Sequence, residues 1–200
     1  MQYDNVRYLF ARHFKSVPGP VDLTRPLNIP VAENQARRFR QSVDIRKLQV
    51  RATSPAQRAM ESLSLGTLND TSPRMIIVPQ LYIPNSRDGR LITWAWSEYG
   101  NEIAGCLSEK GVLAALHRWG RTAAEAFEKV RRYRKTRPFG DEVYFTHFPL
   151  VNFLALHVMR KAQPDGDWER RCFINVAEGA RFETKLEGSP FLAYIDLPAE

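Results

Sequence analysis

The stretch Ser108–Arg137, SEKGVLAALHRWGRTAAEAFEKVRRYRKTR, is the one around which we expect the chain to be organised. Apolar residues recur at helical spacing on both sides of Gly120, and Thr122 followed three residues later by Glu125 matches a capping box at a helix start. Because glycine adopts the left-handed conformation that ends many helices, the pattern predicts two helices with a break at Gly120. The second helix is expected to end before Pro138, in a run of positive charge.

A basic helical hairpin over 108–137 has three interpretations. It can be a helix-turn-helix that reads DNA, a surface that binds phosphate groups, or a structural hairpin with a solvated basic end. Arg121 stands where a helix-turn-helix usually buries an apolar side chain, and the cations gather at the carboxyl end of the second helix. Recognition helices read bases from their amino end, so the structural hairpin is favoured and phosphate binding comes next.

The charge of the chain is unevenly distributed. The 200 residues suit a single domain, 1–200, with 44% apolar and 26% charged residues and a net charge of +7. Residues 1–100 hold 14 Lys or Arg against 8 Asp or Glu, residues 118–137 hold 8 against 2, and residues 141–200 hold 6 against 10. Two basic segments beside an acidic last third predict a polarised surface that favours polyanionic partners.

Two neighbouring segments in the middle of the chain predict a β-hairpin over 75–96. Met75–Ile83 and Leu91–Trp96 are rich in β-branched and aromatic residues, and Asp88-Gly89 between them is a turn signal. Farther on, apolar residues alternate between short turns, which predicts an antiparallel meander over 168–196. We therefore expect an α+β fold, with the hairpin and the meander in one antiparallel sheet and the helices packed on one face.

The remaining segments give shorter predictions. Residues 45–52 and 141–148 are expected to be strands, and the strongly apolar stretch 149–161 is expected to be a helix. Residues 3–15 fit a short helix or a strand equally well. The Pro-rich stretch 16–30 is expected to lie along the domain as an extended arm.

The basic segments Arg37–Arg51 and Arg118–Arg137 suggest a function. Basic side chains interleaved with aromatic ones suit a surface that follows phosphates and stacks bases, although an edge strand protected by charge explains the first segment slightly better. The leading hypothesis is a DNA- or RNA-binding protein, an accessory subunit of a larger complex. The predicted nucleic-acid-binding residues are Arg37, Arg38, Arg40, Arg46, Lys47, Arg51, Arg118, Arg121, Arg131, Arg132, Arg134, Lys135 and Arg137.

Two alternatives stay open. The chain can be an interaction subunit or inhibitor that binds an acidic surface of a protein partner. It can also be a small metal-independent endoribonuclease, which needs a general base, a general acid and a cation. His13, His117 or His147, with a nearby Arg and Tyr144, are the candidates for that chemistry, although a lone histidine between Arg12 and Phe14 is more typical of an exposed site.

Cofactor motifs and targeting signals are not found in the sequence. It has no phosphate-cradling glycine loop, no zinc-ligand spacing and no nucleophile elbow, so we predict neither a cofactor nor a metal. Cys106 and Cys172 are far apart, and no signal peptide or membrane-spanning stretch is recognisable. These features predict free, buried thiols, a cytoplasmic location and no membrane partner.

Overall fold

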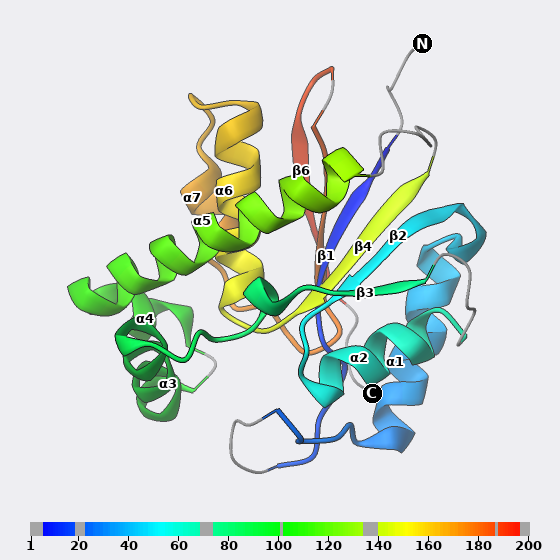
Figure 1. The fold of residues 1–200 in the computed structure, drawn as a ribbon, viewed down its shortest axis with the longest axis horizontal. Helices are drawn as coiled ribbons and strands as arrows, with labels where there is room; N and C mark the ends of the chain where they lie inside the picture. Colours follow the sequence, from blue (N-terminus) through cyan, green and yellow to red (C-terminus); the bar gives the residue numbers. More distant parts are fainter. Residues whose placement is uncertain are drawn as a thin grey trace.

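A central β-sheet with helices on both faces forms the body of the protein (Figure 1). The structure is a computed structural model, which describes residues 6–18, 23–68, 74–100, 102–133, 140–186 and 188–196. Among these residues the sheet has six strands, in the spatial order β3-β2-β4-β1-β5-β6. The strands are β1 (Tyr8–Arg12), β2 (Leu48–Thr53), β3 (Met75–Ile77), β4 (Asp141–Thr146), β5 (Arg181–Lys185) and β6 (Phe191–Ile195).

The helices divide between the two faces of the sheet. Alternate side chains of β1 point to opposite faces, as the pleat requires, so Leu9 joins the core under α1 and α2 while Phe10 joins the larger core under α5 and α6. Both faces are therefore covered. The helices are α1 (Ile29–Ser42), α2 (Gln57–Gly66), α3 (Arg87–Tyr99), α4 (Ile103–Ser108), α5 (Lys110–Tyr133), α6 (Leu150–Ala162) and α7 (Trp168–Cys172), with 3-10 turns at Ile45–Lys47 and Pro79–Leu81.

Most of the sheet is parallel, so the predicted α+β fold with an antiparallel sheet is wrong. β1, β4, β2 and β3 run parallel to one another, and only β5 and β6 are antiparallel to their neighbours. The molecule is an α/β fold with a mixed, mostly parallel sheet. Consecutive parallel strands are joined through helices. The carboxyl ends of the parallel strands therefore lie at the same edge of the sheet.

The predicted hairpin over 75–96 does not form. Met75–Ile77 is a strand, but it pairs with β2, and Leu91–Trp96 lies inside α3. The β-branched and aromatic composition of Leu91–Trp96 was misleading because burial follows helical spacing here: Ile92 and Ala95 are buried, and Trp94 is exposed. The Asp88-Gly89 pair lies in the first turn of α3, where Ser86 Oγ accepts a hydrogen bond from the Gly89 N–H at 3.2 Å.

Only the second half of the predicted meander 168–196 is antiparallel sheet. β5 and β6 form a hairpin, as expected. Residues from Trp168 begin α7 instead of a strand, because Trp168 and Cys172, one helical turn apart, are both buried. The strands predicted over 45–52 and 141–148 correspond to β2 and β4, and the apolar helix predicted over 149–161 is α6.

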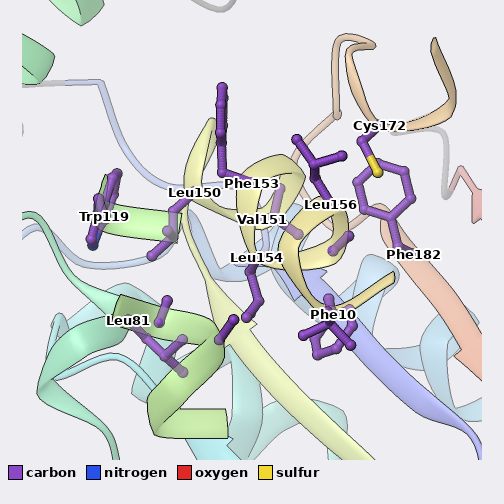
Figure 2. Packing of buried hydrophobic residues seen from close by; sticks show 14 of the residues in the cluster. Phe10, Leu81, Trp119, Leu150, Val151, Phe153, Leu154, Leu156, Cys172 and Phe182 are labelled. Carbon is purple, nitrogen blue, oxygen red and sulfur yellow. The ribbon is translucent and has the colours of Figure 1, made fainter. Parts of the chain in front are cut away.

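The central stretch 108–137 is one helix over its described part, not a hairpin. α5 runs through Gly120 without a break, and Thr122 Oγ1 donates to the carbonyl of Arg118 inside the helix instead of capping a new one. Gly120 is needed for contact with α6: a Cβ there would lie 2.6 Å from Phe153 Cβ. Figure 2 shows Trp119 of α5 and Phe153 of α6 among the buried side chains. Gly120 therefore allows α5 and α6 to approach closely and does not end a helix.

Three further expectations can be compared with the structure. The segment 3–15, left open between helix and strand, contains β1. The Pro-rich stretch 16–30 is described except for residues 19–22, and Ser16 and Leu27 form a bridge across it. Cys106 and Cys172 are both buried and free, as predicted. No helix in the described ranges is long and apolar enough to cross a membrane.

Candidate active site

Polar side chains gather where three parallel strands end. β1 ends at Arg12 and is followed by His13, β2 is followed by Ser54, and β4 is followed by His147. The strand register fixes this meeting, because the His13 N–H donates to the Thr146 carbonyl at 3.0 Å and the Ser54 N–H donates to the Phe145 carbonyl at 3.0 Å. The carboxyl ends of parallel strands are where α/β proteins place their ligand sites, so this edge is the candidate site.

His13 is held as a neutral imidazole in one tautomer. Its Nδ1 lies 2.8 Å from the carbonyl oxygen of Phe14, which can only accept, so Nδ1 carries the proton. Nε2 is then the atom with the lone pair, and it accepts a hydrogen bond from Arg58 Nε at 3.3 Å. Burial, followed by the electrostatic interaction with His147 and the positive charges of Arg12 and Arg58, holds the pKa of His13 well below its usual value. His13 therefore presents an unprotonated nitrogen at neutral pH.

His147 faces His13 from the next strand. The ring centroids are 5.2 Å apart, and only 2% of His13 and 1% of His147 is exposed. His147 Nε2 lies 2.6 Å from Ser54 Oγ, while its Nδ1 is buried with no hydrogen-bond partner among the described residues. Burial, followed by the charges of Arg58 and Arg12, keeps the pKa of His147 well below its usual value. A buried imidazole nitrogen with no partner among the described residues suits a hydrogen bond to a ligand.

Arg12 and Arg58 place two positive charges beside the histidines. Arg12 comes from the end of β1, and Arg58 comes from the first turn of α2; both are buried. Arg12 Nη1 donates to the Val176 carbonyl at 2.6 Å, and its guanidinium lies 5.4 Å from the ring centroid of Phe148. Burial lowers the pKa of Arg12 to about 10, so it stays charged at neutral pH. Two cations in a buried site suit a multiply charged oxyanion.

Glu178 anchors the loop that leads into β5. Its carboxylate accepts from Lys15 Nζ at 2.9 Å and from Ser16 Oγ at 3.1 Å, and it lies 3.9 Å from His13 Nδ1. Burial opposes its ionisation, but Arg12, Lys15 and the Ser16 amide outweigh that effect and lower the pKa of Glu178. Its negative charge therefore offsets part of the charge of Arg12 and orders the segment after His13.

A surface pocket adjoins this cluster. It has a volume of about 470 Å³, and Tyr82 and Pro55 belong to its lining. The Tyr82 ring packs edge-on against the His147 ring at 5.3 Å, and Pro55 follows the Ser54 that hydrogen-bonds His147. Two residues of the pocket lining are therefore direct neighbours of groups in the histidine cluster.

The sequence candidates are partly brought together here. His13 and His147, two of the three histidines named for catalysis, meet at this edge, and the expectation that His13 is exposed is wrong. His117 lies elsewhere, between α5 and α6. Tyr144 lies within β4, where its hydroxyl donates to Glu142 Oε2 at 2.6 Å. Sequence reasoning missed Arg58, Ser54 and Glu178. The available signal was a polar residue directly after each strand. It indicates a shared site only when the strands are known to be parallel, because only then do their carboxyl ends meet at one edge of the sheet.

The residues predicted to bind nucleic acid do not form one surface. α1, which carries the first basic segment, packs on one face of the sheet, and α5, which carries the second, packs on the other. Arg51 is buried in β2. Arg121 and Arg132 are exposed, Arg38 is partly exposed, and Arg134, Lys135 and Arg137 lie outside the described residues.

The other predicted cations interact with nearby groups on the protein. Arg46 and Lys47 pair with Asp44, and Arg118 pairs with Asp88. The remaining contacts are Arg37 with Asn34, Arg40 with the Leu65 carbonyl, and Arg131 with Glu128 and the Tyr8 hydroxyl. Charges satisfied within the chain are poorly placed to follow a phosphate backbone.

Comparisons with known proteins give a consistent result for the fold. No protein-family model matches the sequence, and no curated protein matches it. Solved structures do match: a phosphoserine phosphatase from Entamoeba histolytica in complex with 3-phosphoglyceric acid has 12% identity, a TM-score of 0.63, and coverage of 96% of this chain and 98% of its own. YhfR of Bacillus stearothermophilus has 12% identity, a TM-score of 0.61, and coverage of 95% and 96%. The protein histidine phosphatase SixA complexed with tungstate has 14% identity, a TM-score of 0.51, and coverage of 95% and 94%.

These similarities show the fold alone, a histidine-phosphatase-like α/β fold. Together with the scattered arginines, they correct the leading functional hypothesis: the prediction of a nucleic-acid-binding accessory subunit is wrong, and so are its alternatives of an interaction subunit and an endoribonuclease. Contact with a nucleic acid or protein partner stays an untested prediction.

Proposed function

We propose that this chain is a phosphatase or phosphomutase-type enzyme that carries the phosphoryl group on His13. The observation that carries the proposal is the unprotonated Nε2 of His13, fixed by the Nδ1–H bond to the Phe14 carbonyl and flanked by Arg58. A histidine with this fixed tautomer is a nitrogen nucleophile at neutral pH.

The first step transfers the phosphoryl group from an ester to the protein. The Nε2 lone pair attacks phosphorus, a P–N bond forms, and the ester P–O bond breaks; the departing alkoxide takes a proton from solvent. Arg58, which donates to Nε2, is placed to donate to a phosphoryl oxygen instead. Arg12 adds a second positive charge, and both balance the charge on the equatorial oxygens.

The second step returns the nitrogen to its starting state. Water, or a second alcohol in a phosphomutase, attacks phosphorus, the P–N bond breaks, and the proton of the attacking group is released to solvent. His147 supports both steps through its buried Nδ1, because Ser54 already occupies Nε2. With Nε2 accepting from the Ser54 hydroxyl, Nδ1 bears the proton and can donate it in a hydrogen bond to a phosphoryl oxygen.

The similar structures support the proposal by their ligands and activities. One is named a phosphoserine phosphatase, another a protein histidine phosphatase, and the latter was solved with tungstate. Tungstate is a tetrahedral oxyanion with the shape of phosphate, and a site with two buried arginines and two neutral histidines has the donors that such an anion needs.

The test is the hydrolysis of p-nitrophenyl phosphate by the full chain and by two matched variants. His13→Gln keeps a side chain of similar size but removes the nucleophile, so kcat/KM is expected to fall by at least about 10³-fold. His117→Gln makes the same chemical change at a half-buried histidine outside the site and is expected to leave kcat/KM unchanged. Equal activity of His13→Gln and the unmodified chain would refute the proposal.

Trapping the intermediate gives a second readout. After brief reaction with radiolabelled substrate, the unmodified chain should carry label that is stable to base and lost in acid, as phosphoramidates are. The His13→Gln variant should carry none. Label that resists acid, which indicates a phosphoserine or phosphothreonine, would contradict a histidine intermediate.

A further inference from the structure

The pocket beside the histidine pair lies where the leaving group of a phosphate ester would extend from the phosphoryl group. Pro55 extends from Ser54 into its wall, and Tyr82 contacts His147 on one side and lines the pocket on the other. Its volume of about 470 Å³ falls within the range of small-molecule sites.

The lining is mainly apolar. Three prolines, Leu23 and Ile83 offer aliphatic surface, and Tyr82 and Trp119 offer rings. The Trp119 indole N–H donates to the Gln80 carbonyl at 3.1 Å, so this donor is already used and the rest of the ring is hydrocarbon. Such a surface stabilises a ligand by removing apolar area from water.

The two charged groups of the lining neutralise each other. Arg118 Nε and Nη2 donate to the two carboxylate oxygens of Asp88, each at 2.7 Å, in a bidentate pair. The hydrogen bond to Arg118 lowers the pKa of Asp88, so the carboxylate remains ionised and paired. A carboxylate or ammonium on a ligand would lose water here and gain no unpaired opposite charge from this lining.

We infer that the pocket binds the leaving group of the substrate, and that this group is an uncharged, mainly apolar alcohol such as an aryl or arylalkyl alcohol. The inference rests on the proposed function, since it assigns the part of a phosphate monoester that is not transferred to His13. The phosphoryl group lies among the two histidines and two arginines, and the alcohol extends past Tyr82 and Pro55 into the pocket.

The test compares esters whose alcohols leave with similar ease. Phenethyl phosphate, glycerol phosphate and phosphoserine are all esters of primary alcohols, and methyl phosphate is an ester whose alcohol is too small to fill the pocket. With the full chain, kcat/KM for phenethyl phosphate is expected to exceed that for phosphoserine and glycerol phosphate by about tenfold or more, as apolar pockets commonly discriminate.

A pair of variants at one exposed position tests the pocket itself. Thr122 lies on α5 at the rim of the pocket, outside the histidine and arginine cluster. Thr122→Asp adds a negative charge, and Thr122→Asn has nearly the same shape without the charge. We expect Thr122→Asp to lower kcat/KM for phenethyl phosphate about tenfold relative to Thr122→Asn, with methyl phosphate hydrolysed equally by both.

The outcomes separate the inference from the proposal beneath it. If methyl phosphate is hydrolysed through His13 but phenethyl phosphate is not preferred, or if Thr122→Asp slows both esters equally, the assignment of the pocket fails and the phosphatase proposal stands. If the full chain hydrolyses none of these esters and forms no phosphohistidine, the proposed function fails, and the inference fails with it.

Discussion

His13 and His147 face each other at the carboxyl edge of the sheet, and His117 and His157 face each other between α5 and α6. The ring centroids are 5.2 Å apart in the first pair and 5.4 Å apart in the second. In the second pair the two rings hydrogen-bond each other, with His117 Nδ1 at 3.3 Å from His157 Nε2. In the first pair each ring is bound by a different group, the Phe14 carbonyl and Ser54 Oγ.

This difference decides which pair can react. Where the imidazoles bind each other, the lone pair of one is taken up by the N–H of the other. Where separate groups orient them, His147 Nδ1 has no hydrogen-bond partner among the described residues, and the lone pair of His13 Nε2 faces the N–H of Arg58, a donor that also suits an oxyanion. The first pair is also buried between Arg12 and Arg58, whereas the second is half-buried on helices. Two histidines close together are therefore weak evidence for an active site. The evidence is stronger when their hydrogen bonds fix suitable tautomers and charged side chains lie beside them.

Apart from loss of the nucleophile itself, the largest effect is expected from removing the charge beside the first pair. Arg58→Met keeps the length of the side chain but loses the guanidinium, so kcat/KM for p-nitrophenyl phosphate should fall about 10²–10³-fold. Arg121→Met removes a cation that acts on the second pair, where it helps lower the pKa of His157, and should leave kcat/KM unchanged. Steady-state kinetics of the two variants measure the contrast, and similar losses in both would contradict it.

A smaller effect is expected from the helix contact that brings the second pair together. Gly120→Ala forces a Cβ against Phe153 and against His157 Cδ2, 2.9 Å away, so the free energy of unfolding should fall by about 1–3 kcal/mol. Gly111→Ala on the same helix meets only Leu91 Cδ2 at 3.4 Å and should be neutral or stabilising by up to about 1 kcal/mol. Urea unfolding measures both, and equal stability of the two variants would contradict the close approach.

Gly120 also shows why the fold was only partly predictable. Local signals identified β2, β4, α6 and the last hairpin, because strand propensity and helical spacing act within a few residues. The same signals failed at Gly120 and at Leu91–Trp96, where contacts distant in sequence determine the structure. A glycine that ends a helix and a glycine that lets a second helix pack closely look identical in sequence. A helix end at Gly120 therefore could not be distinguished from close packing against another helix.

The site was less predictable than the fold, for a related reason. His13 and His147 were named as catalytic candidates, but their 134-residue separation hides that strand pairing makes them neighbours. Arg58 gave no signal at all, since an arginine early in a helix is usually solvated. The parallel register of β1, β4 and β2 brings these residues together, and the prediction of an antiparallel sheet excluded that arrangement.

The smallest expected effect concerns how the two pairs respond to pH. Burial lowers the pKa of both His13 and His147 far below the unfolded value near 6.5, so the unfolded chain binds protons that the folded chain excludes. This contribution to stability is therefore largely present above pH 6.5 and is lost as pH drops; for two such groups the free energy of unfolding should fall by on the order of 1 kcal/mol between pH 7 and pH 6. Carboxylates stay ionised throughout this interval, so they contribute little to the change.

Double variants assign that fall to one pair or the other. In His13→Gln/His147→Gln the decrease between pH 7 and pH 6 should shrink by the amount that these two histidines supply. His157, whose pKa burial lowers to about 4, contributes to the same fall, so in His117→Gln/His157→Gln the decrease should also shrink. It should shrink less than for the first pair only to the extent that the half-buried His117 is protonated in the folded chain. Urea titrations at the two pH values give the comparison. A decrease of unchanged size when the first pair is replaced would show that those imidazoles are already solvated, and would contradict the buried neutral nucleophile.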